Sequence, residues 1–248
     1  MRFSIIFEIN KNVIALNYQK LIISILKKCF QLSNKSVYEI FYNSPKIKPF
    51  TFSVYFPESK FEKNKIKLGN KNEIVLNFST YNTEIGLLFY NGLLEYVKKG
   101  FYYKDEEFQL RLKSVILKRE YRIKTDRIKF KTLSPIIVRH HIREKNKDEY
   151  LTLQNSDLEK FENQLNVNMS YVFKEFLGKE YKLRFKPEAI KSVPIKVSNE
   201  KFTKGYIPAN IGTFYLEADI EALDFVYKAG LGARRSFGFG MIEVVKEE

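Results

Sequence analysis

A short segment near the end of the chain, residues 229–243, combines the residue types that bind phosphate groups. It arranges four glycines around two arginines and a serine: Gly230, Gly232, Arg234, Arg235, Ser236, Gly238 and Gly240. Glycines adopt positive φ angles and let a second backbone approach closely, and their exposed N–H groups can receive phosphate oxygens. Arginines add forked donors that stay charged at neutral pH. The segment predicts a phosphate-binding site, and a purely structural turn between a helix and a strand is an equally good interpretation.

The order of elements around these glycines excludes two familiar nucleotide-binding loops. In dinucleotide-binding and Walker loops, the glycines follow a strand and open a helix. Here a helical pattern at 220–229 comes first and an extended pattern at 237–245 comes second. The anion expected at this segment is therefore not a nucleotide held in either of those ways.

The charge of the whole chain also points to an anionic partner. Its 43 Lys and Arg residues outnumber its 29 Asp and Glu residues, which gives a net charge of +14. Nucleic acid is the first candidate and a membrane surface the second, because the charge is not gathered on an amphipathic helix. Alternating residues predict a strand from Arg119 to Lys131 with one basic face. The side chains expected to contact nucleic acid there are Arg119, Arg122, Lys124, Lys129 and Lys131.

The histidines and the cysteine limit the other chemistry that the chain can perform. With one cysteine and two histidines, an internal disulfide and a zinc finger are both excluded. His140 and His141 follow an extended segment, and adjacent strand residues point to opposite faces, so the two are not expected to act as a pair. They are assigned to a loop edge, in contact with nucleic acid or with nothing, and one of them as a catalytic base is the alternative. Cys29 falls on the apolar face of a predicted helix and is assigned to the core.

The first half of the chain contains alternating and helical patterns in a definite order. Residues 3–9, 49–56, 74–79 and 108–113 are predicted as strands. Apolar residues at helical spacing from Asn17 to Phe30 predict one helix, and a second begins at an Asn82 N-cap and ends at Gly100. This order is β-α-β-β-α-β.

The second half repeats that order. A strand or hairpin is expected at 119–138, and extended segments at 181–185, 193–197, 213–218 and 237–245. A capping box from Ser156 to Glu159 opens a helix that ends at Gly178, and Gly230 caps a second helix at 220–229. The sequence therefore predicts an α+β fold with tandem ferredoxin-like (RRM-like) domains, at 1–118 and 119–248.

The aromatic residues and the apolar runs of the chain were also compared with known RNA-binding and membrane-targeting patterns. An RNP1 motif is not present, so the many Tyr and Phe residues are assigned to the core rather than to a base-stacking platform. No apolar run approaches the roughly 20 residues that span a bilayer, and no signal peptide is evident. We therefore expect a cytoplasmic protein without a membrane partner.

The glycine-rich segment, with Arg234-Arg235-Ser236 between its two glycine pairs, closely resembles the G-rich loop of the RAMP superfamily. More narrowly, it is similar to that of the CRISPR-associated endoribonucleases that cut repeat RNA into crRNA. Three other stretches agree with the resemblance, so that it runs from end to end of the chain: Asn17-Tyr18, Lys48-Pro49-Phe50-Thr51-Phe52-Ser53 and Leu133-Ser134-Pro135-Ile136.

The resemblance implies a reaction and a set of site residues. Cleavage would be metal-independent and without a cofactor: the ribose 2′-OH attacks the adjacent phosphate and leaves a 2′,3′-cyclic phosphate and a 5′-OH. The family lysine is present as Lys48, Tyr42 stands where a family histidine is usual, and Lys27 or Lys28 falls near a family tyrosine. A tyrosine titrates near 10, so Tyr42 would serve as a base only if Lys46 and Lys48 lowered its pKa.

The resemblance also implies partners. These are CRISPR repeat RNA, its crRNA product and a CRISPR effector complex, bound by a monomer or a homodimer. The missing histidine keeps an alternative open: a catalytically silent RAMP-type subunit that holds crRNA within an effector complex.

Overall fold

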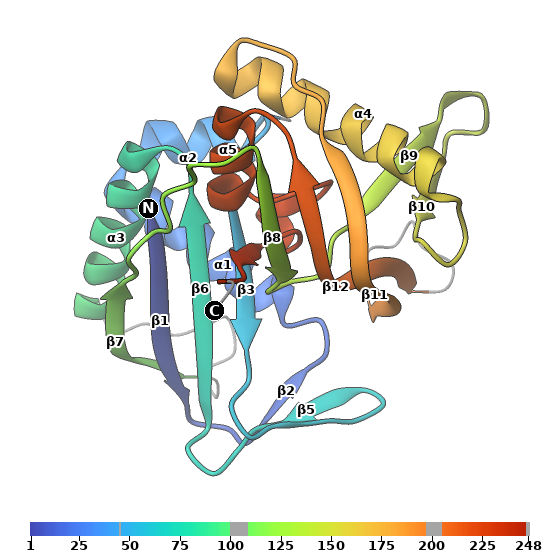
Figure 1. Cartoon of the computed structure of the whole chain (residues 1–248). Coiled ribbons are helices and arrows are strands. Elements are labelled where there is room, and N and C mark those ends of the chain that lie inside the picture. The colour runs from blue at the N-terminus through green and yellow to red at the C-terminus, as the bar shows by residue number, and fades with distance from the viewer. Residues whose placement is uncertain (45, 100–108, 197–204, 247–248) are drawn as a thin grey trace. The chain divides into compact units, whose positions relative to one another are not determined.

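The computed structural model describes residues 1–44, 46–99, 109–196 and 205–246 (Figure 1). The chain divides into two compact units. The first contains Met1–Lys48 and Ser53–Arg119, and the second contains Pro49–Phe52 and Glu120–Glu248. The domain limits 1–118 and 119–248 remain a prediction about which segments fold independently.

The first unit is built on a four-stranded antiparallel sheet. Its elements are β1 (Arg2–Ile9), β2 (Val13–Ala15), α1 (Gln19–Ser33), α2 (Lys35–Tyr42), β3 (Phe50–Tyr55), β4 (Lys60–Phe61), β5 (Lys65–Lys67), β6 (Glu73–Thr80), α3 (Thr83–Lys98) and β7 (Leu110–Leu117), and the start of β3, up to Phe52, is counted with the second unit. The strands lie in the order β3-β6-β1-β7, which is the ferredoxin-like order of a β-α-β-β-α-β unit. The small sheet β2-β5-β4 is an addition that the sequence did not predict.

Apolar periodicity explains the core of this unit. Phe3, Ile5, Phe7 and Ile9 are buried along β1, as their alternation predicts. The residues of α1 that recur at helical spacing are buried: Leu21, Ile22, Ile25, Leu26, Cys29 and Phe30. Asn82 caps α3 as expected, its side chain accepting a hydrogen bond from the Ile85 N–H at 3.0 Å. Gly100 and Phe108, which were assigned to the ends of two elements, lie outside the described residues.

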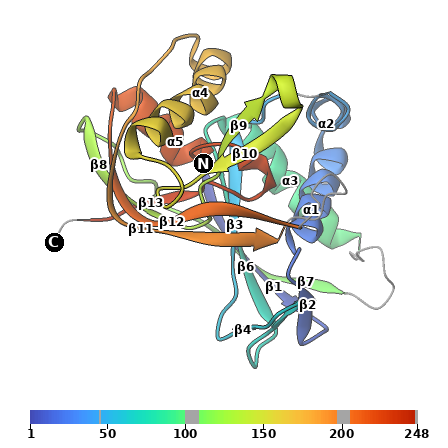
Figure 2. The same ribbon diagram turned by 90° about the vertical axis from the view of Figure 1, so that its right-hand side faces the viewer.

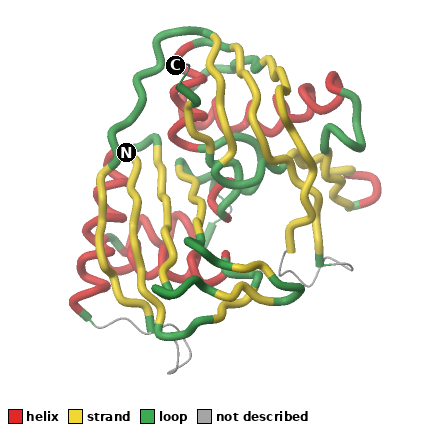
Figure 3. Tube along the Cα trace, turned by 60° about the horizontal axis from the view of Figure 1, so that its bottom comes forward, coloured by secondary structure: helices red, strands yellow, loops and turns green. Residues whose placement is uncertain are grey.

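The second unit repeats the arrangement with one insertion. Its elements are β8 (Arg127–Thr132), β9 (Val138–Ile142), a 3-10 turn (Arg143–Lys145), β10 (Lys147–Leu151), α4 (Leu158–Leu177), β11 (Arg184–Lys196), β12 (Tyr206–Glu217), α5 (Ile220–Ala229), a second 3-10 turn (Arg235–Phe237) and β13 (Ile242–Val244). The order β11-β12-β8-β13 is again ferredoxin-like, and Figure 3 shows its strands in yellow. The predicted fold class is confirmed. The insertion is the β9–β10 hairpin, which the sequence did not predict.

Several boundaries in this unit differ from the predictions. Residues 119–126 are irregular and β8 begins at Arg127, so the predicted strand from Arg119 to Lys131 is too long. The cap of α4 is Asp157, which accepts from the Lys160 N–H at 2.7 Å, and not Ser156. β11 is one strand rather than two, and the extended segment predicted at 237–245 shortens to β13.

The longer β11 has a physical reason. It runs through Pro187, which lies between the two predicted extended segments, and through Pro194 inside the second of them. β11 is an edge strand of its sheet, and proline is tolerated there because one side of the strand needs no ladder donor. Among the described residues, no helix has both the length and the apolar character needed to cross a membrane.

Candidate functional site

The glycine-rich segment is a packed loop whose backbone donors are already used. The N–H groups of its glycines donate within the second unit: Gly230 to Val226 O (2.9 Å), Gly232 to Met169 Sδ (3.2 Å), Gly238 to Arg235 O (3.0 Å) and Gly240 to Pro135 O (2.8 Å). All four glycines are buried. The expectation that these N–H groups are exposed to receive phosphate oxygens is therefore wrong for this conformation.

Close contact between two stretches of backbone explains why the loop needs glycine. Gly240 has a φ of +69°, and a Cβ placed on it would lie 1.9 Å from the carbonyl oxygen of Leu231. The Leu231 N–H in turn donates to Gly240 O at 2.8 Å. The two ends of the loop are thus hydrogen-bonded to each other, with no room for a side chain between them.

Segments that are distant in the sequence support this loop. The Thr51 hydroxyl donates to Phe239 O at 2.8 Å, and Thr51 belongs to the second compact unit. Ser134 Oγ accepts a hydrogen bond from the Met241 N–H at 2.9 Å. The carbonyl of the next residue, Pro135, accepts the hydrogen bond from the Gly240 N–H. Three of the stretches that carry the family resemblance therefore meet around one loop.

The two adjacent arginines of the loop have opposite environments. Arg235 is 5% exposed, and its Nη1 donates to Ala229 O at 3.0 Å, near the C-terminus of α5. Burial lowers the pKa of Arg235 to about 10, so it remains charged at neutral pH and offsets the negative end of the helix dipole. Its predicted role in RNA binding is corrected, because a buried guanidinium does not reach a phosphate in solvent.

Arg234 and Ser236 occupy the outer side of the loop. Arg234 takes a left-handed backbone conformation with φ +56°, and its Nη2 donates to the Tyr150 hydroxyl at 2.7 Å. Both Arg234 and Ser236 are partly exposed, and the neighbouring Phe237 is 51% exposed. These side chains, rather than the glycine backbone, are what the loop offers to a partner.

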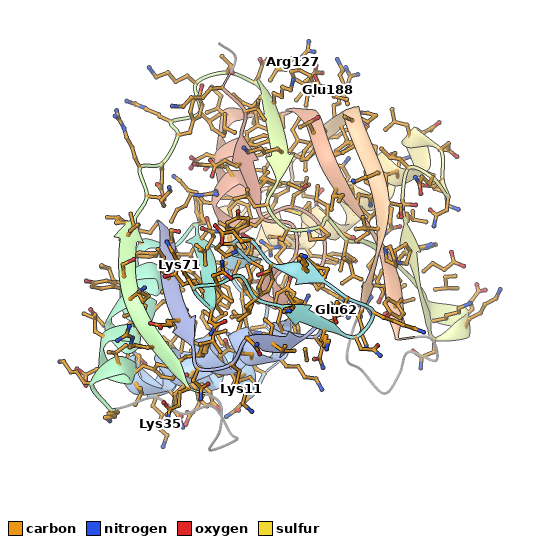
Figure 4. The ribbon with its side chains drawn as sticks, turned by 90° about the horizontal axis from the view of Figure 1, so that it is seen from below. Lys11, Lys35, Glu62, Lys71, Arg127 and Glu188 are labelled. Atoms are coloured by element: carbon orange, nitrogen blue, oxygen red, sulfur yellow. The ribbon has the colours of Figure 1, made fainter. Side chains whose placement is uncertain are left out.

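The basic face predicted on β8 is partly neutralised. Lys129 Nζ lies 2.7 Å from Glu188 Oε1, and Arg127 Nε lies 3.6 Å from Glu217 Oε1. Figure 4 labels Arg127 and Glu188, whose side chains extend outwards from this sheet. Lys131 is exposed at the end of β8, and further exposed cations precede the strand in the irregular segment: Arg119, Arg122 and Lys124. All of these residues are cationic and accessible, but they do not form the single strand face that the alternation predicted.

The predicted catalytic residues of the first unit form a cluster of three, not four. Lys27 Nζ lies 5.1 Å from the centroid of the Tyr42 ring, and Lys48 Nζ lies 5.0 Å from the same centroid. Lys28 points elsewhere, because its Nζ donates to Gln31 Oε1 at 3.2 Å in solvent. Lys27 and Lys28 are consecutive in α1, where successive residues face different directions, so only one of them can face α2.

Local helix chemistry holds Tyr42 in place. α2 begins at Asn34, whose side chain accepts from the Val37 N–H at 3.0 Å. Phe41 is buried edge-on against Phe30 of α1, with ring centroids 5.4 Å apart, and this contact anchors the last turn of α2. Tyr42 follows directly, so the anchored turn directs its ring towards the two lysines.

The electrostatics of the cluster differ from the sequence-based expectation. Burial, with smaller contributions from Cys29 and Tyr38, raises the pKa of the Tyr42 hydroxyl. The lysines therefore do not lower it, and that hypothesis is wrong. Burial and then the nearby charge of Lys27 lower the pKa of Lys48. At neutral pH the tyrosine is a proton donor, and of these groups Lys48 is the one moved towards its neutral form.

The two histidines lie outside this cluster, on β9. His141 Nδ1 lies 2.8 Å from Asp148 Oδ1, and His140 Nδ1 lies 3.9 Å from Glu149 Oε2, so each has its own acidic partner on β10. Within the described residues, no group of three or more His, Cys, Asp and Glu side chains is arranged to hold a metal ion.

Comparison with known proteins identifies the family. The family model described as "CRISPR associated protein Cas6, C-terminal" matches residues 117–244. The chain belongs to the Cas6 family. A curated relative, "CRISPR-associated endoribonuclease Cas6 1" of Methanocaldococcus jannaschii, is 25% identical over 243 residues, which cover 96% of this chain and 90% of the relative.

Solved structures agree on the Cas6 fold. One, described as "Characterization of a Cas6-related gene from Pyrococcus furiosus", has a TM-score of 0.81 at 24% identity and covers 100% of this chain and 99% of its own. Another, "An RAMP protein binding different RNA substrates", has a TM-score of 0.80 at 21% identity and covers 99% of this chain and 100% of its own. The tandem ferredoxin-like architecture is thereby confirmed, and the family match confirms the resemblance to the CRISPR-associated endoribonucleases.

Proposed function

We propose that this Cas6-family protein is a metal-independent endoribonuclease that binds CRISPR repeat RNA and cuts it to generate crRNA. The observation that carries the proposal is the cluster of Lys27, Tyr42 and Lys48, in which two ammonium groups lie about 5 Å from one phenol ring. The reaction needs a group that accepts a proton, a group that donates one and positive charge near the phosphorane. Lys48, Tyr42 and Lys27 can supply the proton acceptor, the proton donor and the positive charge.

Each residue has a defined step in this mechanism. Lys48, whose pKa is lowered, accepts the proton of the ribose 2′-OH as its oxygen forms a bond to phosphorus. The bond from phosphorus to the 5′ oxygen breaks, and Tyr42, whose raised pKa keeps it protonated, donates a proton to that oxygen. The side chain of Lys27, beside the Tyr42 ring, stabilises the phosphorane. The products are a 2′,3′-cyclic phosphate and a 5′-OH.

Accessible cations supply the RNA-binding surface of the proposal. Arg122, Lys124 and Lys131 are exposed in the second unit, and Arg234 projects from the loop. Each phosphate that such a side chain neutralises on single-stranded RNA contributes about 0.7 to the slope of log affinity against log salt. Binding is therefore expected to weaken steeply as salt increases.

A catalytically silent crRNA-binding subunit is the second candidate. A specific observation favours it: the chain's two histidines are both on β9, and the pKa of the tyrosine that replaces the family histidine is raised rather than lowered. Such a subunit would use the same RNA-binding surface and leave the repeat intact.

One experiment separates the two candidates. The purified protein is incubated with its cognate repeat RNA in EDTA, and the product ends are mapped. A single cut that leaves a cyclic phosphate supports the nuclease, whereas tight, salt-sensitive binding without cleavage supports the silent subunit.

The helix α1 provides a matched control for that assay. Lys27→Ala removes the charge beside Tyr42, whereas Lys28→Ala removes an exposed charge one residue away that donates to Gln31. We expect only Lys27→Ala to slow cleavage. Equal effects of the two variants would indicate general loss of positive charge and would contradict the catalytic role of the cluster.

A further inference from the structure

A groove of about 620 Å³ lies in the second unit between the β9–β10 hairpin and α4. Figures 1 and 2 both show the hairpin beside this helix. Arg139, His140 and His141 of β9 line one side, Val167 and Tyr171 of α4 line the other, and Ala233 of the glycine-rich loop completes it. Its volume falls within the range of small-ligand sites.

Hydrogen bonds make the floor of this groove rigid. Asn168 of α4 holds the backbone of Arg139 through both of its polar groups: its Oδ1 accepts from the Arg139 N–H and its Nδ2 donates to the Arg139 carbonyl, each at 2.7 Å. Gln164, one turn earlier, donates to the same carbonyl at 2.9 Å. The helix and the hairpin are therefore fixed to each other before any ligand arrives, so binding costs little ordering.

The arginine that lines the groove is already paired with a carboxylate. Arg139 Nη2 lies 2.8 Å from Asp148 Oδ1, and the same carboxylate accepts from His141 at 2.8 Å. Glu149 lies opposite His140 on the neighbouring strand. A phosphate would have to compete with Asp148 for Arg139, so the groove does not favour an anion.

The aromatic and apolar side chains of α4 in the groove instead suit a flat, polar ring. Tyr171 is 64% exposed, and Val167, one turn before it on the same helix face, is 49% exposed. His140 and His141 of β9 line the groove opposite them. Stacking on an aromatic face and a few hydrogen bonds to the base edge are the means by which proteins hold unstacked RNA bases.

We propose that this groove binds one unstacked nucleobase of single-stranded RNA, stacked on Tyr171, with the polar groups of β9 at its edge. The inference rests on the proposed function in one respect, because it takes the ligand to be the repeat RNA. Ala233 forms a β-bridge with Ile137 just before β9, so RNA bound at the outer side of the glycine-rich loop would pass the mouth of the groove. This subsite would read a base, whereas the exposed cations would hold the backbone.

The test is a double-mutant cycle between protein and RNA. Affinity is measured for wild-type protein, Tyr171→Ala and Tyr171→Phe, using the repeat blocked by a 2′-deoxy nucleotide at its cleavage site, or the unmodified repeat if no cleavage occurs. Each protein is also tested against a series of repeats with one abasic nucleotide, moved along the sequence. Phe61→Ala, in the first unit at the same 64% exposure, is the control variant.

Stacking on Tyr171 predicts a definite pattern. Tyr171→Ala should bind about 5- to 150-fold more weakly, the range expected for one stacked base, whereas Tyr171→Phe should bind like wild type. One abasic position should weaken wild type but not Tyr171→Ala, and the salt dependence of the variant should be unchanged, because no phosphate contact is lost. Phe61→Ala should match wild type.

Three outcomes would overturn the inference. They are unchanged affinity of Tyr171→Ala, coupling to no abasic position, and a wild-type protein that does not bind the repeat. Binding without cleavage would refute the proposed nuclease and leave the groove testable, so the two proposals fail separately.

Discussion

Replacing Tyr42 with phenylalanine tests the proposed chemistry with little disturbance of the fold. The ring of Tyr42 lies near two ammonium groups and stacks at a tilt with Tyr38, at 5.4 Å between centroids. Each cation–π contact contributes about 0.5–1 kcal/mol at such a site, and phenylalanine retains both contacts. Tyr42→Phe removes only the hydroxyl, so the free energy of unfolding should change by no more than the ~0.5–1.5 kcal/mol of one hydrogen bond.

The effect on cleavage should be much larger than the effect on stability. If the hydroxyl donates the proton to the leaving oxygen, its loss should slow cleavage by about 10²–10⁴-fold, equivalent to about 2.7–5.5 kcal/mol in the barrier. The assay is single-turnover cleavage of the repeat in EDTA with enzyme in excess, beside urea denaturation of the same preparations. Tyr38→Phe serves as the control, because it removes a hydroxyl from the adjacent ring.

The result that would refute this reasoning is also specific. A tenfold or smaller loss in Tyr42→Phe corresponds to about 1.4 kcal/mol, which an ordinary hydrogen bond accounts for. Tyr42 would then be a positioning residue, and the proton donor would have to be sought elsewhere. A loss of equal size in Tyr38→Phe would likewise remove the special role of Tyr42.

Two further predictions concern the pH dependence of cleavage and the packing of the loop. Lys27→Gln removes a charge that lowers the pKa of Lys48, so the pKa of Lys48 should rise in this variant. The cleavage rate should then increase with pH only at higher pH than in the wild type. A pH–rate profile that does not move would contradict the role of Lys48 as the base. Gly240 and Gly178 have almost the same backbone φ, +69° and +68°, so an alanine is equally strained at either position. The two positions differ in space: a Cβ at Gly240 would clash with backbone, whereas a Cβ at Gly178 would meet nothing within 4 Å. Urea denaturation should therefore show a loss of about 1–2 kcal/mol for Gly178→Ala and more than about 4 kcal/mol for Gly240→Ala, and equal losses would show that the loop adjusts freely.

Much of the fold could be predicted because its elements carry a period. The buried face of α1 and the whole of α5 with its Gly230 cap follow from apolar spacing and a terminal glycine. The β9–β10 hairpin was missed because it is short and mostly polar, and because the preceding segment merges with β8 in the alternation. The sequence predicted two extended segments where the structure has the single strand β11, because proline usually ends a strand. Only the sheet order shows that β11 is an edge strand, where proline is tolerated.

The candidate site could be predicted only as a set of residue types. The sequence contains Lys27 and Lys28 side by side, and helical geometry says that they face differently, but only the position of α2 decides which one meets Tyr42. Which of Arg234 and Arg235 is exposed cannot be predicted either, because a loop has no repeating pattern of buried positions. In the structure Arg234 lies on the outer side and Arg235 is buried. The pKa of Tyr42 is raised mainly by burial of its side chain, and the sequence gives no signal of that burial.

The internal hydrogen bonds of the glycine-rich loop bear on how it could contact RNA. To present its four glycine N–H groups to phosphates, the loop would have to break four bonds and expose the tightly packed backbone around Gly240. Each buried donor left unpaired costs about 1–3 kcal/mol, and a new phosphate contact would have to offset that cost before adding any affinity. A rigid loop avoids this cost by using its glycines for packing and its outer side chains for contact. The buried Arg235 donates to the carbonyl of Ala229 at the C-terminus of α5. Arg234, one residue away, lies on the outer side of the loop and donates to the Tyr150 hydroxyl. The glycines are thus best understood as the scaffold that holds Arg234 and Ser236 in place.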